Sequence, residues 1–509
     1  MSIVAIEWGV TPVDLSKINA DYACFIKIGD ELADNAMALL EVAIARDQPD
    51  ILYSDEAIVY GHPPKIFHFY KPDYSPDMLL SYNYIRNLLC VKARLLRTIN
   101  IPKHTHYDHF LYEVLLAVLP SSKKITHIDE VLYYHRSDKK RIGYHDFYAN
   151  IDQNAGRAAL QRYCQANGIE AEVKDGRYHG TYHLQYAIQG QPLVSIIIPF
   201  KDQAALLHAC ITSIIEKSTY KNIEIIGIDN GSQKKETIAL MASLQQKDSR
   251  IQFHTLAIPY NFSLLNNYAA TYFAKGEHLL LLNNDTQVIE PSWIEALLEH
   301  SQRSDVGVVG AKLLYADGAI QHCGILLGPF DRHAHKGLDN EQTGYFYFPH
   351  VVRNYHALTF ACVMIKADIF RQLNGLCEEL PAAYNDIDFC ARVSALGYQN
   401  VYTPYAVLYH YESKSRGFDD SPKKVQLTMQ AKLITQARHP VLFEKDSMYN
   451  KHLTDRDSDF SEKPTGEHKP SLRRFIKKLR RACKAFGILT VSRFVINRLI
   501  SELIVRIKK

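Results

Sequence analysis

The chain has 509 residues, too many for one hydrophobic core, and its length predicts about two to four domains. Apolar residues make up 47% and charged residues 22%, which is the composition of a globular protein and excludes a disordered or fibrous chain. The nine cysteines are scattered without a CxxC pair. This argues against a structural zinc site or a disulfide framework and favours a reducing cytosol.

The net charge of +4 is unevenly distributed. Residues 469–509 hold thirteen Lys or Arg and one acidic residue, Glu502, so the remainder carries a net charge of −8. An acidic body argues against a nucleic-acid partner, whereas the basic tail predicts contact with an anionic surface. The first residues lack the features of a secretory signal, and no run approaches the roughly 18 apolar residues of a membrane-spanning helix.

Composition and pattern divide the chain into five segments. The predicted segments are a mixed α/β block (1–137), a connector that begins with a helix (138–191), an α/β domain (192–440), a polar linker (441–470) and a basic amphipathic helical tail (471–509).

Within 192–440, a series of apolar runs ends in polar side chains. Asp229 follows the predicted strand 223–228, Asn284 and Asp285 follow four leucines, and His410 follows the strand that ends at Tyr409. Ligands of open α/β sheets bind at the carboxyl ends of the strands. The series therefore predicts a binding site at one edge of a sheet.

This ordered set, with Tyr384-Asn385-Asp386-Ile387-Asp388, resembles the catalytic domain of a family 2 glycosyltransferase with the GT-A fold. The stretches 168–173, 180–182 and 192–195 resemble the segment that joins two such modules in bacterial O-antigen and polysaccharide biosynthesis proteins of rhamnosyltransferase-like type. The implied class is α/β: a Rossmann-like GT-A domain preceded by a truncated GT-A-like module and followed by a helical tail.

The resemblance implies a nucleotide-sugar donor. Its contacts fall on Pro199 at the end of the first strand, Asp229, Asn267, Asn284 and Arg416. An ordinary doubly wound sheet with Asp-Gly turns is the alternative reading of the first of these motifs.

The resemblance also implies a divalent ion, Mn²⁺ or Mg²⁺, held by Asp285 and His410. Hard ions prefer oxygen ligands and commonly bind one or two carboxylates together with substrate phosphate. The alternative for Asp285 is a helix N-cap, but the next helix is expected to begin at Pro291-Ser292-Trp293.

By the same resemblance, Asp386 is the general base that takes the proton of the acceptor hydroxyl. Asp388 is expected to orient backbone or acceptor groups. Two aspartates that merely cap a helix are the alternative.

The first block resembles the second half of another GT-A module. Lys27 and Gly29 occupy the positions where a metal site of this kind has carboxylates, although Asp108 and His135 resemble parts of the later motifs. Only one strand fits upstream of residue 20, so the nucleotide-binding half is predicted to be missing and the module to be inactive.

His322, His333 and His335 lack the spacing of a metal site and are expected to be surface histidines of a long loop.

The overall prediction is an inverting, metal-assisted glycosyltransferase that moves a sugar from a nucleotide donor to a hydroxyl of a cell-surface polysaccharide or lipid-linked glycan. The amphipathic tail predicts peripheral attachment to the inner face of the cytoplasmic membrane, or else packing on the domain itself or on a partner. The alternatives are a non-catalytic scaffold of a polysaccharide assembly complex and a sugar nucleotidyltransferase; the latter wants a Gly-rich phosphate loop that Phe200-Lys201-Asp202 does not supply.

Overall fold

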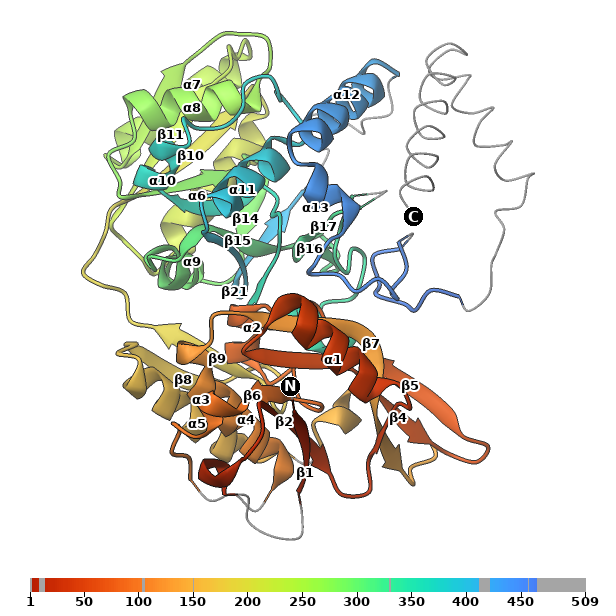
Figure 1. Cartoon of the computed structure of the whole chain (residues 1–509). Coiled ribbons are helices and arrows are strands. Elements are labelled where there is room, and N and C mark those ends of the chain that lie inside the picture. The colour runs from red at the N-terminus through yellow and green to blue at the C-terminus, as the bar shows by residue number, and fades with distance from the viewer. Residues whose placement is uncertain are drawn as a thin grey trace.

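Two mixed α/β bodies, each built on its own β-sheet, make up the computed structural model of the protein (Figure 1). The structure describes residues 2–8, 14–102, 106–149, 151–328, 331–411, 422–455 and 457–464. The predicted tail, 471–509, lies outside the described residues.

The C-terminal body contains a ten-stranded sheet with the order β12-β11-β10-β13-β20-β15-β21-β14, to which β16 and β19 add at the side. The strands are β10 (Val194–Phe200), β11 (Ile223–Asp229), β12 (Ile251–Thr255), β13 (His278–Leu282), β14 (Thr286–Val288), β15 (Val306–Leu314), β16 (Ile320–His322), β19 (Arg353–Asn354), β20 (Cys362–Lys366) and β21 (Gln399–His410). A separate hairpin consists of β17 (Ile325–Leu326) and β18 (Arg332–His333).

Strands β10 to β13 are parallel, and a helix connects each to the next. Strands covered by helices on both faces read as continuous apolar runs, which explains why Leu279–Leu282 carries no alternation. The helices of this body are α6 (Ala204–Lys217), α7 (Lys235–Lys247), α8 (Phe262–Tyr272), α9 (Trp293–Ser301), α10 (Ala367–Gln372), α11 (Asn385–Ala395), α12 (Pro422–Arg438) and α13 (Pro440–Glu444). Helix α9 begins where the sequence predicts it.

The N-terminal body contains a seven-stranded sheet with the order β1-β2-β6-β4-β7-β3, and β5 pairs with β4. Its strands are β1 (Ile3–Trp8), β2 (Tyr22–Lys27), β3 (Glu31–Leu32), β4 (Ile51–Tyr60), β5 (Lys65–Phe69), β6 (Cys90–Lys92) and β7 (Ile125–Ser137). Its helices are α1 (Ala36–Asp47), α2 (Pro76–Ser81), α3 (Ala93–Leu96) and α4 (Tyr107–Val118).

The two sheets repeat one topology. The series β1-β2-β6-β4-β7-β3 matches β10-β13-β20-β15-β21-β14 in order, and each neighbouring pair has the same parallel or antiparallel sense. Among the described residues, β11 and β12 have no counterpart in the N-terminal sheet. The prediction of an α/β fold whose first module is a truncated counterpart of the second is therefore confirmed.

The connector is more regular than its composition suggests. After α5 (Gln153–Ala166) it forms an antiparallel hairpin, β8 (Ala171–Asp175) and β9 (Tyr182–Tyr186). His183 on β9 lies 3.1 Å from the carboxylate of Glu299 on α9. The hairpin thereby attaches the connector to the C-terminal body.

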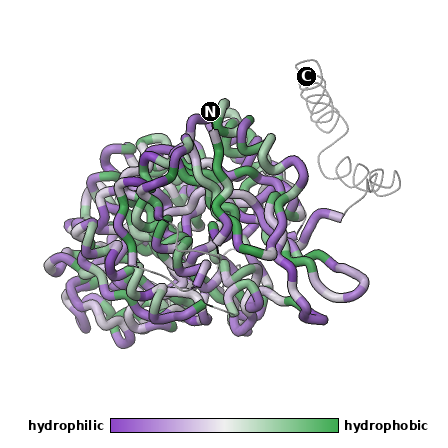
Figure 2. The backbone as a smooth tube through the Cα atoms, turned by 60° about the horizontal axis from the view of Figure 1, so that its bottom comes forward, coloured by the Kyte–Doolittle hydropathy of each residue, from purple (hydrophilic) through white to green (hydrophobic). Residues whose placement is uncertain are grey.

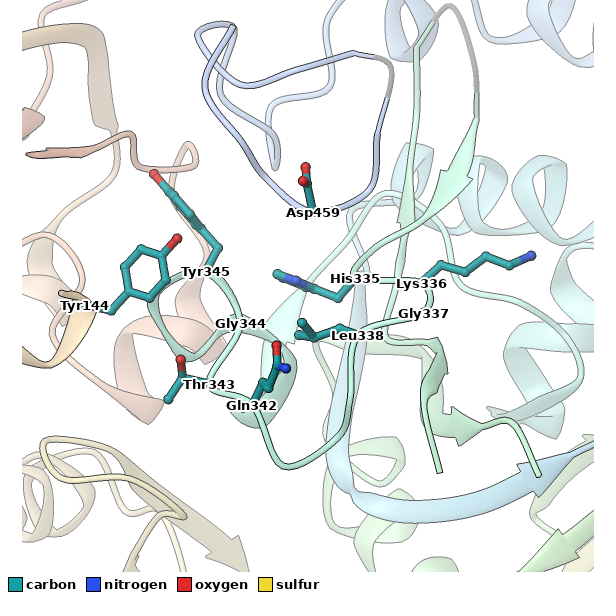
Figure 3. A pocket seen from close by; sticks show the side chains of 10 residues that line it. All are labelled: Tyr144, His335, Lys336, Gly337, Leu338, Gln342, Thr343, Gly344, Tyr345 and Asp459. Atoms are coloured by element: carbon teal, nitrogen blue, oxygen red, sulfur yellow. The ribbon is translucent and has the colours of Figure 1, made fainter. Parts of the chain in front are cut away.

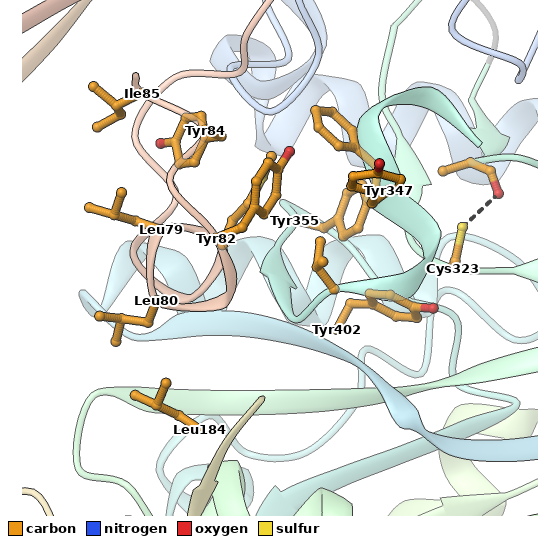
Figure 4. Packing of buried hydrophobic residues seen from close by; sticks show 14 of the residues in the cluster. Leu79, Leu80, Tyr82, Tyr84, Ile85, Leu184, Cys323, Tyr347, Tyr355 and Tyr402 are labelled. Carbon is orange, nitrogen blue, oxygen red and sulfur yellow. Dashed lines mark hydrogen bonds between the residues drawn. The ribbon is translucent and has the colours of Figure 1, made fainter. Parts of the chain in front are cut away.

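Aromatic side chains of both bodies pack together in one core. Phe69 stacks on Phe346 with ring centroids 3.7 Å apart, and Tyr148 lies between Tyr82 and Tyr347. Figure 4 shows tyrosines of the N-terminal body facing tyrosines of the C-terminal body across this core. The two bodies therefore share a hydrophobic core instead of meeting through a polar surface.

Residues 445–464, which fall in the predicted linker, pack against both bodies. Asn450 donates to the carboxylate of Asp55 at 2.9 Å, and Lys451 pairs with Glu130 at 2.7 Å. On the other side, Arg332 donates to the carbonyl of Thr454 at 2.8 Å. We call this segment the strap, because it is hydrogen-bonded to both bodies.

Hydrophilic and hydrophobic residues are interspersed along most of the chain (Figure 2). In the part of the chain that the structure describes, no helix combines the length and apolarity needed to cross a bilayer.

A buried ion pair joins the bodies. Arg303, just after α9, donates to the carboxylate of Asp77 in α2, which also accepts a hydrogen bond from Asn354 at 2.8 Å. Burial opposes ionisation of Asp77, but the charge of Arg303 and the hydrogen bonds from Arg303 and Asn354 together outweigh it, so the pKa of Asp77 lies below its ordinary value.

Arg303→Ala is expected to lower the free energy of unfolding by roughly 3–5 kcal/mol, because it leaves the Asp77 carboxylate buried without a cation. Chemical denaturation measures this loss. The control is Arg136→Ala, which breaks an exposed pair with Glu31 and should cost less than about 1 kcal/mol. Equal effects of the two variants would show that the buried pair does not hold the bodies together.

Candidate functional site

The two predicted metal ligands meet at one edge of the C-terminal sheet. Strand β13 ends at Leu282, and a turn carries the chain into β14, which pairs antiparallel with the end of β21. Because Thr286 lies opposite His410 in this pairing, the preceding carboxylate of Asp285 reaches the imidazole: Oδ1 lies 3.2 Å from Nε2. Both side chains are buried.

Gln321 fixes the orientation of the His410 ring. Its Oε1 lies 2.8 Å from Nδ1, and Asn283 Nδ2 lies 3.2 Å from Nε2. These contacts fit a neutral ring whose Nδ1–H donates to Gln321 and whose Nε2 is an acceptor. The sequence did not indicate Gln321, since 89 residues separate it from His410.

The donor set fits a hard divalent ion. It combines a carboxylate oxygen with an imidazole nitrogen in acceptor form, and their separation of 3.2 Å is close to the roughly 3 Å between adjacent ligands with bonds of about 2.1 Å. Among the described residues, no cluster of three His, Cys, Asp or Glu could hold an ion. Asp285 and His410 alone do not complete a coordination shell, so the ion would need further ligands.

The predicted base, Asp386, occupies the first turn of α11. Its carboxylate accepts a hydrogen bond from the backbone of Ile387 at 2.9 Å. Loss of solvation is the main cause that raises its pKa, to about 6, and the nearby negative charge of Asp331 adds to the effect. A carboxylate with this pKa is a stronger base than an ordinary aspartate and is still ionised at neutral pH.

Asp331 is a second group that sequence reasoning missed. Its Oδ2 accepts hydrogen bonds from the hydroxyl of Tyr384 at 2.7 Å and from Lys432 of α12 at 2.8 Å. The β17–β18 hairpin presents Asp331 to the start of α11, a proximity that no local pattern reveals.

Asp386 and the Asp285 turn are neighbours through residues Phe360 and Ala361. The backbone N–H of Phe360 contributes to holding the Asp386 carboxylate ionised, and the carbonyl of Ala361 accepts a hydrogen bond from the Asn283 backbone at 2.9 Å. One dipeptide thus connects the candidate base to the candidate metal ligands.

Asp388 is a structural ion-pair centre. Its buried carboxylate accepts a hydrogen bond from Arg392 at 2.9 Å and lies 3.1 Å from His439. Arg392 in turn donates to the carbonyls of Leu373 and Gly375. These contacts hold α11 against its neighbours, and a contact with an acceptor remains a prediction.

The ends of β10 and β11 form the candidate nucleotide cradle. Pro199 pairs with Ile228 in the parallel ladder, and the buried Asp229 accepts a hydrogen bond from the Ser232 backbone at 2.8 Å. The carboxylate of Asp202 closes the opposite turn by accepting from the backbone of residues 233 and 234. The cradle is therefore held by hydrogen bonds on both sides.

The remaining predicted donor contacts are dispersed. Asn284 is buried in the turn beside Asp285. The side-chain amide of Asn267 is hydrogen-bonded to the backbone of Leu376: it donates to the carbonyl at 2.9 Å and accepts from the N–H at 2.8 Å. Arg416 lies outside the described residues.

The expectation that the histidines of the 320–335 loop are surface residues is wrong. His322 and His335 are buried, and His322 Nδ1 lies 2.8 Å from His333 Nδ1. Burial lowers the pKa of His322 well below its usual value, and the nearby His333 and His410 lower it further. His322 is thus a neutral side chain behind the candidate metal ligand.

The N-terminal sheet carries a degenerate counterpart of this site. Lysines 92 and 366 stand in the same ladder position immediately before α3 and α10, opposite Tyr22 and His278. Counting from these positions, Gly29 corresponds to Asp285 and Lys27 to Asn283. His135 is retained at the position of His410, but its ring lies 2.7 Å from Asp30.

Comparison with known sequences identifies the C-terminal body. Residues 195–371 match the model of the family described as "Glycosyl transferase family 2". This segment is a family 2 glycosyltransferase domain. It contains the cradle strands and the Asp285 turn.

Two related proteins align with most of the chain, including the segments on both sides of the family 2 domain. "Uncharacterized protein y4gI" of Sinorhizobium fredii is 38% identical over 78% of this chain, and "O-antigen biosynthesis protein RfbC" of Myxococcus xanthus is 32% identical over 85%. The chain spans only 44% and 34% of these two proteins. A solved structure, "Mannosyltransferase PcManGT from Pyrobaculum calidifontis in complex with GDP-Man and Mn2+", shares 13% identity at a TM-score of 0.35, covering 69% of this chain and 90% of that one.

Asp386→Asn is expected to raise the melting temperature at pH 8 and to change it little near pH 4. The folded protein keeps this carboxyl protonated up to pH about 6, whereas an unfolded aspartate ionises near 3.8. Stability is therefore lost as the pH rises between these values, and the neutral amide avoids that loss.

The matched control in this experiment is Asp388→Asn, which should lower the melting temperature at both pH values because it removes the charge that pairs with Arg392. A lower melting temperature of Asp386→Asn at pH 8 would contradict the inference that loss of solvation destabilises the ionised carboxylate.

Proposed function

We propose that the chain is an inverting glycosyltransferase that transfers a sugar from a nucleotide-sugar donor to a hydroxyl of a glycan. The carrying observation is that Asp285, within the segment that matches family 2, meets His410 at a distance of 3.2 Å at the carboxyl edge of the sheet. The structural link from this pair to Asp386 supports the proposal, because a transferase needs a base for the acceptor hydroxyl within reach of the carbon whose bond to the leaving group breaks.

In the proposed reaction, the acceptor hydroxyl lies against Asp386. Its oxygen attacks the anomeric carbon from the face opposite the nucleotide, and the proton passes to the Asp386 carboxylate. The new glycosidic C–O bond forms as the bond from carbon to the diphosphate oxygen breaks, so the configuration inverts. Desolvation of the Asp386 carboxylate supports its role as base.

Asp285 and His410 would hold a divalent ion, Mn²⁺ or Mg²⁺, and Gln321 keeps the His410 Nε2 directed toward it. Such an ion, when bound, neutralises charge on the departing nucleoside diphosphate. Asp229 would accept hydrogen bonds from the nucleoside, and Pro199 would shape the floor of its cradle. Asn267, Asn284 and Arg416 remain proposed donor contacts.

The acceptor we propose is a cell-surface polysaccharide or its lipid-linked precursor, in line with the RfbC relative, which is described as an O-antigen biosynthesis protein. The basic amphipathic tail would attach the enzyme to the cytoplasmic face of the membrane, where lipid-linked glycans are exposed. The N-terminal body, with Gly29 in place of a metal-binding carboxylate, would not catalyse transfer.

Asp285→Ala is expected to weaken metal-dependent binding of the cognate nucleotide sugar at least tenfold. Calorimetry with a panel of nucleotide sugars, first with Mn²⁺ and then with chelator, measures it. Asp368→Ala, at an exposed aspartate on α10, is the matched control. Absence of binding to any donor by folded wild-type protein would favour the non-catalytic scaffold.

Asp386→Asn is expected to reduce transfer by at least a thousandfold while donor binding persists, because the amide cannot accept the proton. In the wild type, kcat/KM should fall as the pH drops through about 6, where the base becomes protonated. Asp331→Asn should move this limb to lower pH by removing a neighbouring negative charge. Substantial turnover by Asp386→Asn would disprove the assignment of the base.

A further inference from the structure

A pocket of about 400 Å³ opens where three separate parts of the chain meet. Tyr144 of the connector forms one wall, the 335–345 loop of the family 2 domain forms the floor, and Asp459 of the strap lies above it (Figure 3). The volume falls within the range of small-ligand sites. None of the residues proposed for donor, metal or base lines it.

The backbone around this pocket is held in conformations that side chains disfavour. His335 has a φ of 52°, Phe346 of 44° and Tyr347 of 63°, and all three are buried. The turn between them contains Gly344, also at positive φ, where a Cβ would meet Pro349 at 2.7 Å. Strained backbone of this kind costs free energy and persists only where the surrounding packing holds it. It is concentrated at active sites and ligand-binding loops.

His335 provides an unsatisfied polar group at this pocket. The side chain is 2% exposed and its ring stacks on Phe460 with centroids 4.3 Å apart, yet Nε2 has no hydrogen-bond partner among the residues that the structure describes. A buried polar atom without a partner is unfavourable, because it has lost its hydrogen bonds to water. A ligand that hydrogen-bonds to Nε2 would remove this cost.

The chemistry of the walls selects for a neutral, hydroxyl-rich ligand. Tyr144 and Tyr345 provide aromatic surface, and Gln342, Thr343 and Asp459 provide polar groups. Burial lowers the pKa of His335 well below its usual value, and the neighbouring cationic groups lower it further, so the ring is neutral. The one cationic side chain of the lining, Lys336, extends away from the pocket toward the ring of Tyr315 (Figure 3).

The pocket also lies close to the proposed reaction centre along the chain. His410 contacts Gln321, the adjacent His322 contacts His333, and His335 follows two residues later. Two residues span at most about 7 Å. A short series of contacts thus connects the candidate metal ligand His410 to the lining of this pocket.

We propose that this pocket binds sugar units of the acceptor glycan behind the hydroxyl that reacts. This inference rests on the proposed transferase function. Tyr144 and Tyr345 would contact the apolar C–H faces of a sugar ring, and Gln342, His335 and Asp459 would hydrogen-bond to its hydroxyls. Because the connector and the strap complete the pocket, acceptor binding requires both bodies of the chain.

The test uses full-length protein and an array of short bacterial oligosaccharides, followed by titration of those that bind. Tyr144→Ala and Gln342→Ala are each expected to weaken oligosaccharide binding at least tenfold. His335→Phe should do the same, since it keeps the ring stacked on Phe460 and removes Nε2. Matched controls are Tyr272→Ala and Gln246→Ala, at exposed positions on α8 and α7.

Calorimetry with the nucleotide-sugar panel separates the two proposals. Pocket variants that lose oligosaccharide binding and keep wild-type donor affinity support the inference. If the wild type binds donor but no oligosaccharide, or if all three variants bind oligosaccharide like the controls, the pocket proposal is wrong and the proposed function stands. If the wild type binds no donor, the proposed function itself fails.

Discussion

The candidate site depends on one constraint: the three-residue strand β14 pairs antiparallel with the end of β21. Without it, Asp285 and His410 would lie on separate loops, because β13 and β21 are not neighbours in the sheet. The pairing also fixes which side of β21 faces the turn, since a slip of one residue reverses every side chain. His410 rather than Tyr409 or Tyr411 therefore meets the carboxylate.

Much of this arrangement follows from the sequence for physical reasons. The leucines before Asn283 form a strand that is buried on both faces. The chain therefore leaves the sheet and turns at the polar residues that follow. The first turn of α11 likewise begins at the acidic motif. These features are local, and local pattern suffices to predict them.

The sequence could not predict Gln321, Asp331 or the strap. Gln321 lies on the short strand β16 and Asp331 in the turn between β17 and β18, and tertiary packing decides where both are placed. Neither has a local signature. The strap reads as a linker because it is polar, yet Asn450 and Asp446 are buried by hydrogen bonds to groups far away in the sequence. The prediction for the histidines of the 320–335 loop was wrong for the converse reason. Their polar side chains suggested exposure to solvent, whereas packing buries His322 and His335.

The repeated sheet topology separates the requirements of folding from those of chemistry. Both bodies keep the strand order and the histidine at the end of β7 or β21, whereas the carboxylate position holds Gly29 in one and Asp285 in the other. The Asp30–His135 pair replaces what a metal-binding carboxylate would provide to the ring. A sheet of this topology is thus stable without the metal ligands.

The strap has a consequence for the order of assembly during synthesis. Domains generally fold as they leave the ribosome, N-terminal first, at roughly 5–20 residues per second of elongation. Asp55 belongs to the first body, but its partner Asn450 emerges only after the whole second body has been made. The first body must therefore wait, with a buried carboxylate incompletely bonded, until the strap has been synthesised, and this interval is when a chaperone has most to protect.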